Sequence, residues 1–268
     1  MYKLLVMDFD NTLVGHDLKI SGINKKAISD AIEKGVKVCI CSGRSFVTLE
    51  IFERELGLFG RNDFGICYNG AKIHNIDTRE IIYEKELAND IAMQVITEIK
   101  KLGVDPMVYH NDKINIEMRK DSSLKRYSGK GTVEVVMLND FREIKEDITK
   151  ILVVGEREVV AGVKKEIEPL FNKRCNIFYS AEQLLEVTNH GASKGNALKY
   201  LANLYDIGMS EVIAIGDNHN DISMIEYAGV GCAVKNSVDE LKDIAGYITE
   251  STCTENAVAE VIQKYILS

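Results

Sequence analysis

Hydrophobic residues in the first part of the chain form short uninterrupted runs separated by amphipathic segments. The runs YKLLVMDF (2–9), VKVCIC (36–41) and FGICY (64–68) are apolar nearly throughout, which is typical of strands in a parallel sheet covered on both faces. Between these runs, helical periodicity extends over residues 23–34 and 46–56. The repeated strand–helix–strand order predicts a doubly wound, Rossmann-like α/β unit with a parallel sheet.

The same alternation returns near the C-terminus. A helical segment at 193–206 precedes an apolar strand at 211–217, and a short helix at 221–228 precedes a strand at 230–234. A closing helix is predicted over residues 254–266. These segments have the pattern expected of the second half of the sheet that begins at the N-terminus.

The middle of the chain has a different pattern, in which hairpins mix with helices. One predicted hairpin turns at Asn111–Asp112, and a long helix extends over about residues 159–172. This pattern predicts an antiparallel α+β module inserted into the α/β domain. We expect a core domain formed by residues 1–82 and 188–268, and an inserted cap domain at 83–187.

Composition and charge exclude several kinds of partner. The 268 residues carry a net charge of −8 and no stripe of Lys and Arg, so no nucleic-acid surface is expected. No apolar run approaches the ~20 residues of a membrane span, and the first residues lack the pattern of a signal peptide. We therefore expect a cytoplasmic protein whose six cysteines are mostly small buried hydrophobic residues. Both a monomer and a small homo-oligomer remain open.

Two carboxylates, Asp8 and Asp10, end the first predicted strand. Burying an unpaired carboxylate costs several kcal/mol, so a function must favour these residues. In an extended chain, positions i and i+2 point the same way about 6.6 Å apart. That spacing suits phosphoryl transfer, in which one carboxylate attacks phosphorus and the other protonates the leaving oxygen. The alternative is that Asp8 caps a turn and Asp10 is solvated.

A second pair of carboxylates, Asp217 and Asp221, lies in the stretch AIGDNHND, where another strand ends and a helix begins. Together with Asp8 and Asp10 they would repel one another unless a cation neutralised them. Oxygen ligands of this kind suit Mg²⁺. His219 in the same stretch is interpreted as a hydrogen-bonding neighbour of the cluster and not as a ligand.

Two further stretches occupy a strand end and a helix start. In CICSGRS, the Ser42 hydroxyl and the Gly43 amide can bind phosphoryl oxygens, although Ser-Gly is also ordinary turn chemistry. Lys194 begins a predicted helix, where a cation is unfavourable next to the positive end of the helix dipole. A nearby anion would explain this lysine, and so would full solvation.

The four stretches together are more specific than any one of them. DFDNTLV, CSGRS, SKG and GDNHNDISM resemble, in this order, the four motifs of the haloacid dehalogenase-like (HAD) superfamily. The insertion lies between the second and third motifs, as in the Cof-type phosphatases with a type IIB α+β cap. The resemblance covers essentially the whole chain.

The resemblance implies a role for each catalytic residue. Asp8 would be the nucleophile that forms an aspartyl-phosphate, and Asp10 the general acid and then the base for the hydrolytic water. Ser42 and Lys194 would hold the phosphoryl oxygens that are transferred.

The resemblance also implies a magnesium site and a substrate site. Mg²⁺ would be bound by the Asp8 carboxylate, the Asp10 carbonyl and Asp217, while Asp221 would order metal-bound waters or Lys194. The residues expected beside the substrate are Gly43, Arg44, Asn69 and Asn220.

One of these positions has a second interpretation, and one further position departs from the family's usual sequence. Asn69 can equally be a turn asparagine preceding Gly70. Asn11 replaces the glycine that this family usually has after the second aspartate. Because asparagine tolerates left-handed backbone better than other non-glycine residues, we expect the turn at Asn11 to be preserved.

The function expected on these grounds is a Mg²⁺-dependent phosphatase for small phosphorylated metabolites, above all sugar phosphates. The alternatives are a phosphosugar mutase of related fold, which would require a bisphosphate activator, and a non-catalytic phosphometabolite-binding protein. The polar, locally basic stretch Arg119–Gly131 is a candidate specificity loop or an ordinary solvated loop.

Overall fold

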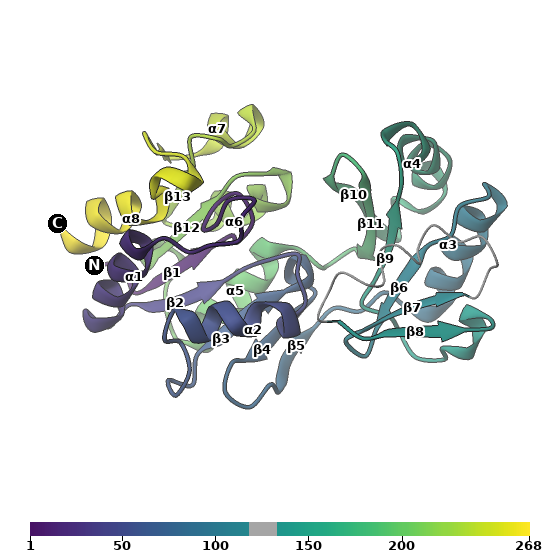
Figure 1. Ribbon diagram of the computed structural model, residues 1–268, viewed down its shortest axis with the longest axis horizontal. Helices are drawn as coiled ribbons and strands as arrows, with labels where there is room; N and C mark the ends of the chain where they lie inside the picture. Colours follow the sequence, from purple (N-terminus) through teal and green to yellow (C-terminus); the bar gives the residue numbers. More distant parts are fainter. Residues whose placement is uncertain (118–132) are drawn as a thin grey trace. The chain divides into compact units, whose positions relative to one another are not determined.

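The chain forms two compact units, which are described separately (Figure 1). The computed structural model describes residues 1–117 and 133–268. The first unit combines Met1–Glu84 with Ser193–Ser268, and the second is Lys85–Ala192. The second unit is therefore an insertion within the first. The candidate specificity loop predicted at residues 119–131 lies outside the described residues.

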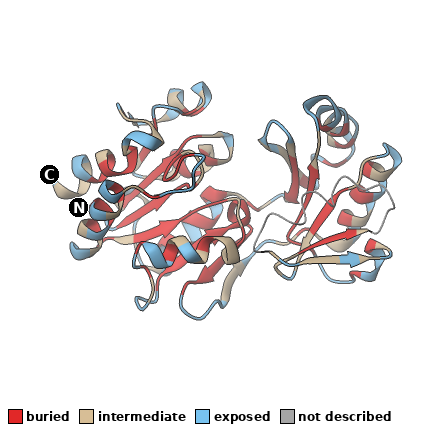
Figure 2. Ribbon diagram, in the orientation of Figure 1, coloured by how far each residue is buried: buried red, intermediate tan, exposed pale blue. Residues whose placement is uncertain are grey.

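A parallel sheet forms the centre of the first unit, with the strand order β14-β13-β12-β1-β2. β1 lies between β12 and β2, and Leu4 pairs with Val212 on one side and with Lys37 on the other. β1 and β12 are buried at every residue, and β2 and β13 at all but their first (Figure 2), which explains why these sequences are largely apolar. The edge strand β14 is more exposed. The strands are β1 (Leu4–Met7), β2 (Lys37–Ile40), β12 (Val212–Gly216), β13 (Val230–Ala233) and β14 (Tyr247–Ile248).

Helices surround this sheet and begin at side-chain caps. The hydroxyl of Ser193 accepts a hydrogen bond from the Asn196 amide, and Ser21 does the same for Asn24. α1 packs against α8, and α5 against α6. The helices of this unit are α1 (Gly22–Glu33), α2 (Phe46–Glu55), α5 (Lys194–Leu204), α6 (Ile222–Tyr227), α7 (Asp239–Ile244) and α8 (Ala257–Ile262), which continues as a π-helical turn (Gln263–Leu267).

The apolar run at 64–68 forms a strand, as predicted, but this strand is not part of the central parallel sheet. It forms β3 (Phe64–Cys67), which belongs to a separate antiparallel sheet with β4 (Lys72–Asn75) and β5 (Ile81–Glu84). An isolated parallel bridge between Cys41 and Ile66 is its link to the β2 end of the central sheet. The chain reverses directly after β3, and a strand that returns through a short turn pairs antiparallel.

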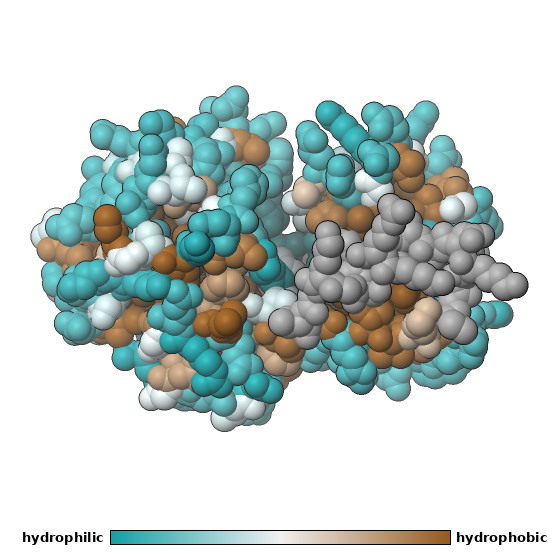
Figure 3. All heavy atoms as spheres, viewed as in Figure 1, coloured by the Kyte–Doolittle hydropathy of each residue, from teal (hydrophilic) through white to brown (hydrophobic). Residues whose placement is uncertain are grey.

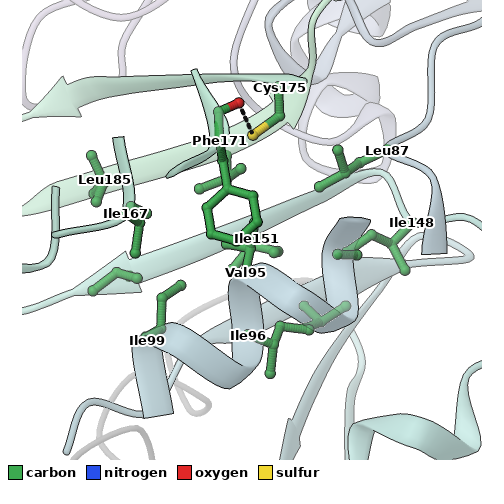
Figure 4. Packing of buried hydrophobic residues seen from close by; sticks show 14 of the residues in the cluster. Leu87, Val95, Ile96, Ile99, Ile148, Ile151, Ile167, Phe171, Cys175 and Leu185 are labelled. Carbon is green, nitrogen blue, oxygen red and sulfur yellow. Dashed lines mark hydrogen bonds between the residues drawn. The ribbon is translucent and has the colours of Figure 1, made fainter. Parts of the chain in front are cut away.

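The second unit is an α+β module with its own core (Figure 4). Val95 and Ile99 of α3 and Ile167 and Phe171 of α4 pack with Ile151 of the sheet in one buried cluster. The described strands follow the order β10-β11-β9-β6-β7-β8 and are antiparallel except for the parallel pair β7–β8. The elements are α3 (Asn89–Lys101), β6 (Met107–His110), β7 (Lys113–Glu117), β8 (Val135–Leu138), β9 (Lys150–Val154), α4 (Arg157–Phe171), β10 (Cys175–Ala181) and β11 (Leu184–Asn189).

The visible surface of the first unit is mostly polar (Figure 3), and most of the cysteines are buried, as the sequence predicts. In Figure 3 the visible face of the first unit is mostly hydrophilic, with apolar atoms in small groups. All six cysteines are free thiols, and each except Cys253 is buried. Within the described parts of the chain, no helix combines the length and the apolar character that a membrane crossing needs.

Candidate functional site

Three carboxylates meet where neighbouring strands of the central sheet end. Asp8 follows β1 and Asp217 follows β12, and the Asp8 amide donates to the Ile215 carbonyl at 2.9 Å. Asp221 ends the 3₁₀ turn that leads into α6. One oxygen from each of these carboxylates lies within 4.8 Å of the others, and all three residues are buried. The sheet thus brings together the first and fourth motifs of the sequence.

Lys194, the first residue of α5, lies between these carboxylates. Its side chain is fully buried, and the ammonium group donates to Asp221 at 2.6 Å and also to Asp8. Burial alone would lower the pKa of Lys194, but the charges of Asp221 and Asp8 raise that pKa above its ordinary value. Of the two explanations that the sequence left open for this lysine, a nearby anion and full solvation, the structure thus supports the nearby anion.

The same burial acts against ionisation of the carboxyl groups. It raises the pKa of Asp8, and the charges of Asp221 and Asp217 add to the effect of burial while Lys194 opposes it. Burial, together with the charge of Asp221, raises the pKa of Asp217 to about 7. Because these carboxylates outnumber the ammonium group among them, a further cation would favour their ionised forms. Buried oxygen donors so close together fit a divalent metal ion, and the cluster is a candidate metal site.

Hydrogen bonds hold the cluster in place. One Asp221 oxygen accepts from the backbone amides of Asp217, at 2.9 Å, and Asn218, at 3.0 Å. The buried hydroxyl of Thr12 donates to Asp217 at 3.1 Å. A Cβ atom on Gly216 would lie 2.5 Å from the Cβ of Asp221, so the close approach requires glycine there. The sequence interpretation missed Thr12, although a hydroxyl two residues after the second aspartate in DFDNT was a signal for it.

Asp10 does not join the cluster through its side chain. Its carboxylate accepts two hydrogen bonds from the Arg44 guanidinium, at 2.8 and 2.7 Å, and its side chain is 44% exposed. The expectation that four carboxylates converge is therefore wrong, because three do. β1 ends at Met7, and the chain then turns, so the spacing rule for extended strands does not apply to Asp8 and Asp10.

The second motif follows β2 and lies in the same unit. Ser42 is 1% exposed, its amide donates to the Ile66 carbonyl, and its hydroxyl accepts from the Arg44 amide at 3.2 Å. Asn69 and Asn220 come together, since the Asn220 amide group donates to the Asn69 side-chain oxygen at 3.0 Å. The structure thus links two of the predicted substrate-binding residues to each other.

Two smaller predictions concern backbone and charge near the site. Asn11 has a φ of 58°, which confirms the left-handed turn predicted for it. His219 is exposed and contacts the side-chain oxygen of Asn218 at 2.9 Å. His219 lies outside the carboxylate cluster. This agrees with the prediction that it is a neighbour of the cluster and not a ligand.

Buried aspartates and a lysine at the carboxyl ends of a parallel sheet, beside a candidate metal site, are the parts required for phosphoryl transfer. This chemistry and the inserted α+β unit define a class of hydrolases. The comparisons with known proteins then identify the family.

The sequence profile of the haloacid dehalogenase-like hydrolase family matches residues 5–262. The 5-amino-6-(5-phospho-D-ribitylamino)uracil phosphatase YcsE of Bacillus subtilis (strain 168) is 30% identical over 268 residues, which are 99% of this chain and 96% of that protein. The crystal structure of a haloacid dehalogenase-like hydrolase from Bacteroides thetaiotaomicron is 30% identical and superposes with a TM-score of 0.87, covering 98% of this chain and 99% of that one. The HAD subclass IIB sugar phosphatase BT4131 has a TM-score of 0.80 at 22% identity, with 98% of each chain covered, which shows the shared fold.

The chain belongs to the haloacid dehalogenase-like (HAD) hydrolase family. It is a HAD-type phosphatase, which is a phosphoric monoester hydrolase. Its substrate is accordingly a small phosphorylated molecule.

Proposed function

We propose that this protein hydrolyses small phosphorylated metabolites, above all sugar phosphates, in a Mg²⁺-dependent reaction that passes through an aspartyl-phosphate on Asp8. The observation that carries the proposal is the buried contact of Lys194 with Asp8 and Asp221, beside Asp217. This contact supplies a nucleophile, a cation for the transferred group and a site for a metal ion in one place.

In the first step, an Asp8 carboxylate oxygen forms a bond to phosphorus while the ester P–O bond breaks. The leaving alkoxide takes a proton from the carboxylic acid of Asp10 and departs as an alcohol. Lys194 and the Ser42 hydroxyl hold the phosphoryl oxygens, whose negative charge they stabilise in the transition state.

In the second step, a water molecule attacks phosphorus and gives its proton to Asp10, and the bond to Asp8 breaks. The products are inorganic phosphate and the free Asp8 carboxylate. Asp10 cannot meet the substrate while both its oxygens bind Arg44. The mechanism therefore requires the ion pair to open when substrate binds, which frees Arg44 to contact the substrate and Asp10 to transfer protons.

The metal ion proposed here is Mg²⁺, which the carboxylates of Asp8 and Asp217 and the Asp10 carbonyl would hold, and Asp221 would support this site from beside it. Carboxylate and carbonyl oxygens are the ligands that Mg²⁺ prefers. When bound, it supplies positive charge that keeps the Asp8 carboxylate ionised and offsets the charge of the phosphoryl group.

We propose further that the inserted unit Lys85–Ala192 is the cap domain that selects substrates. The boundaries predicted from the sequence, 83 and 187, lie within a few residues of those of this unit. The YcsE relative is a phosphatase for an ester of a ribityl chain, and BT4131 is a sugar phosphatase. Both names support phosphate esters of polyhydroxylated molecules as the substrates to test first.

The test is phosphate release from a panel of sugar, flavin and pyridoxal phosphates, with Mg²⁺ and with a chelator. We expect Mg²⁺-dependent turnover that disappears in Asp8→Asn and persists in Asp243→Asn, which removes the same charge from an exposed position on α7. Mass spectrometry of acid-quenched enzyme should find phosphate on the peptide that contains Asp8. If no ester releases phosphate, the hydrolase proposal fails, and a bisphosphate-activated mutase or a binding role takes its place.

A further inference from the structure

The turn that follows β3 has a backbone conformation that its sequence disfavours. Tyr68, Asn69 and Gly70 have consecutive positive φ values of 53°, 56° and 88°. A bulky L-residue such as tyrosine rarely adopts this region, and the Tyr68 side chain is fully buried. Backbone strain of this kind persists where the surroundings impose it, and it concentrates at functional sites.

The surroundings that impose it are the other loops of the site. The Tyr68 amide donates to the Arg44 carbonyl and the Asn69 amide to the Ser42 carbonyl, each at 2.9 Å. The turn is therefore fastened by its backbone to the second motif. A Cβ atom on Gly43 would lie 3.0 Å from the Asn69 side chain, so the two loops are also in close contact there.

The side chain of Asn69 connects the same turn to the fourth motif. Its oxygen accepts from the Asn220 amide group at 3.0 Å, and Asn220 lies in the 3₁₀ turn that ends at Asp221. A shift of the turn would thus reach the loop that carries a member of the carboxylate cluster.

Gly70 connects the turn to the third motif. A Cβ atom on Gly70 would lie 2.2 Å from the Ser193 carbonyl oxygen and 2.8 Å from the Lys194 amide nitrogen. Both are backbone atoms at the first residues of α5, so they cannot rotate away as a side chain could. The start of α5, which includes Lys194, packs directly against this turn.

We propose that the turn Tyr68–Gly70 is a positioning element that holds the loops of Ser42 and Asn220 and the start of α5 in register, and that Gly70 sets the place of Lys194 relative to Asp8. The turn touches each of these three segments. The inference concerns the architecture of the site and rests on the proposed function only for its kinetic readout.

Gly70→Ala tests the proposal, with Gly35→Ala as the matched control. Gly35 has nearly the same φ, 85° against 88°, but a Cβ atom there would meet no heavy atom within 4 Å. Both variants carry the same backbone strain, and only Gly70→Ala displaces α5. A displacement of about 1 Å in a catalytic group lowers turnover roughly 100-fold.

We expect kcat to fall at least about 100-fold in Gly70→Ala and to remain near that of the unmodified enzyme in Gly35→Ala. Inhibition by orthovanadate, which mimics the transition state, should weaken far more than inhibition by inorganic phosphate. Loss of stability alone would lower the apparent kcat in proportion to the unfolded fraction and leave the ratio of the two inhibition constants unchanged. Equal kcat in the two variants would overturn the proposal.

Crystal structures of the two variants test the positioning independently of activity. In Gly70→Ala, we expect Lys194 to lose its hydrogen bond to Asp8 or to Asp221, and an unmoved Lys194 would refute the inference even if the enzyme proved not to be a phosphatase. Absence of turnover in the unmodified enzyme would instead refute the proposed function and leave this structural outcome decisive.

A milder variant covers the case in which Gly70→Ala does not fold. Asn69→Gly retains a residue suited to positive φ and removes the side chain that binds Asn220. In a double-mutant cycle with Asn220→Ala, we expect each single change to lower kcat about 10-fold and the double variant to lose little more, because the two residues act through one contact. Fully additive losses would show that Asn69 does not act through Asn220.

Discussion

The buried ammonium group of Lys194 determines the charge balance at the scale of single residues. It faces Asp8 and Asp221, and Asp217 lies beside them. Removal of one partner from a buried ion pair leaves the others uncompensated, which is more destabilising than replacement of the whole pair.

Lys194→Met should therefore lose activity and stability together. We expect kcat to fall about 10²–10³-fold and the free energy of unfolding in chelator to fall by about 3–5 kcal/mol at neutral pH. Added Mg²⁺ should restore part of the stability, because a metal ion replaces the missing positive charge. Phosphate release and urea unfolding with and without Mg²⁺ measure both effects.

The control is Lys37→Met, which breaks the ion pair of Lys37 with the buried Asp63, 2.6 Å long, away from the cluster. It should reduce stability and leave kcat unchanged. A Lys194→Met enzyme with normal kcat would contradict the role given to this lysine.

The raised pKa of Asp217, about 7, predicts a pH dependence of stability in the metal-free protein. The folded protein binds the Asp217 proton more tightly than the unfolded chain does, so this contribution is full below pH ~4 and is lost as pH rises to ~7. The groups that face Asp217 are Asp8, Asp221, Lys194 and the Thr12 hydroxyl.

Asp217→Asn isolates this contribution from those of other carboxyl groups. Between pH 4.5 and 7, the unfolding free energy of the unmodified protein should fall relative to the variant by up to about 1.4 kcal/mol per pH unit. Urea titrations in chelator measure the difference. With saturating Mg²⁺ the difference in slope should vanish or reverse, and a pH-independent difference in chelator would refute the assignment.

At the scale of elements, the cap of α5 matters because a functional residue begins that helix. Ser193 caps α5 as Ser21 caps α1, with hydrogen bonds of 3.1 and 3.0 Å to the amides of Asn196 and Asn24. Both serines make the same bond to their helix, and the Ser21 hydroxyl also donates to the Asn256 side-chain oxygen at 2.5 Å. Lys194 directly follows Ser193.

Ser193→Ala and Ser21→Ala should each lower the unfolding free energy by about 1 kcal/mol, because each leaves a helix amide without its acceptor. We expect kcat to fall several-fold only in Ser193→Ala, where fraying of the first turn moves Lys194. Paired denaturation and kinetic measurements test this, and equal kcat in both variants would contradict it.

At the scale of the whole molecule, the candidate metal site belongs to one unit. Asp8, Asp217 and Asp221 all lie within Met1–Glu84 and Ser193–Ser268, while the second unit has a separate hydrophobic core. A ligand that binds only the folded state stabilises it by RT ln(1 + c/Kd), where c is the free ligand concentration.

Mg²⁺ should therefore slow hydrogen exchange in β1, β12 and α5 and leave α3 and α4 unaffected in the absence of substrate. Exchange followed by mass spectrometry, in Mg²⁺ and in chelator, measures this. Asp217→Asn should abolish the protection. Equal protection of both units would contradict a site confined to the first.

The sequence by itself determined the elements and the positions where they end. Apolar runs and helical periodicity depend on neighbours within a few residues, so the strands at 4–7, 37–40 and 212–216 and the residues that follow them could be predicted locally. The motif order then identified Asp8, Ser42, Lys194 and Asp217 as candidates, and the comparisons support the family.

Only the tertiary structure decided which side chains meet. The bond between Thr12 and Asp217 spans 205 residues, and that between Lys194 and Asp8 spans 186. The pairing of Asp10 with Arg44 arises in turns, where side-chain direction follows no period and depends on packing between distant segments. Periodicity is a local property of the chain, whereas the charge balance of a buried site is a property of the folded state, and therefore the structure had to supply it.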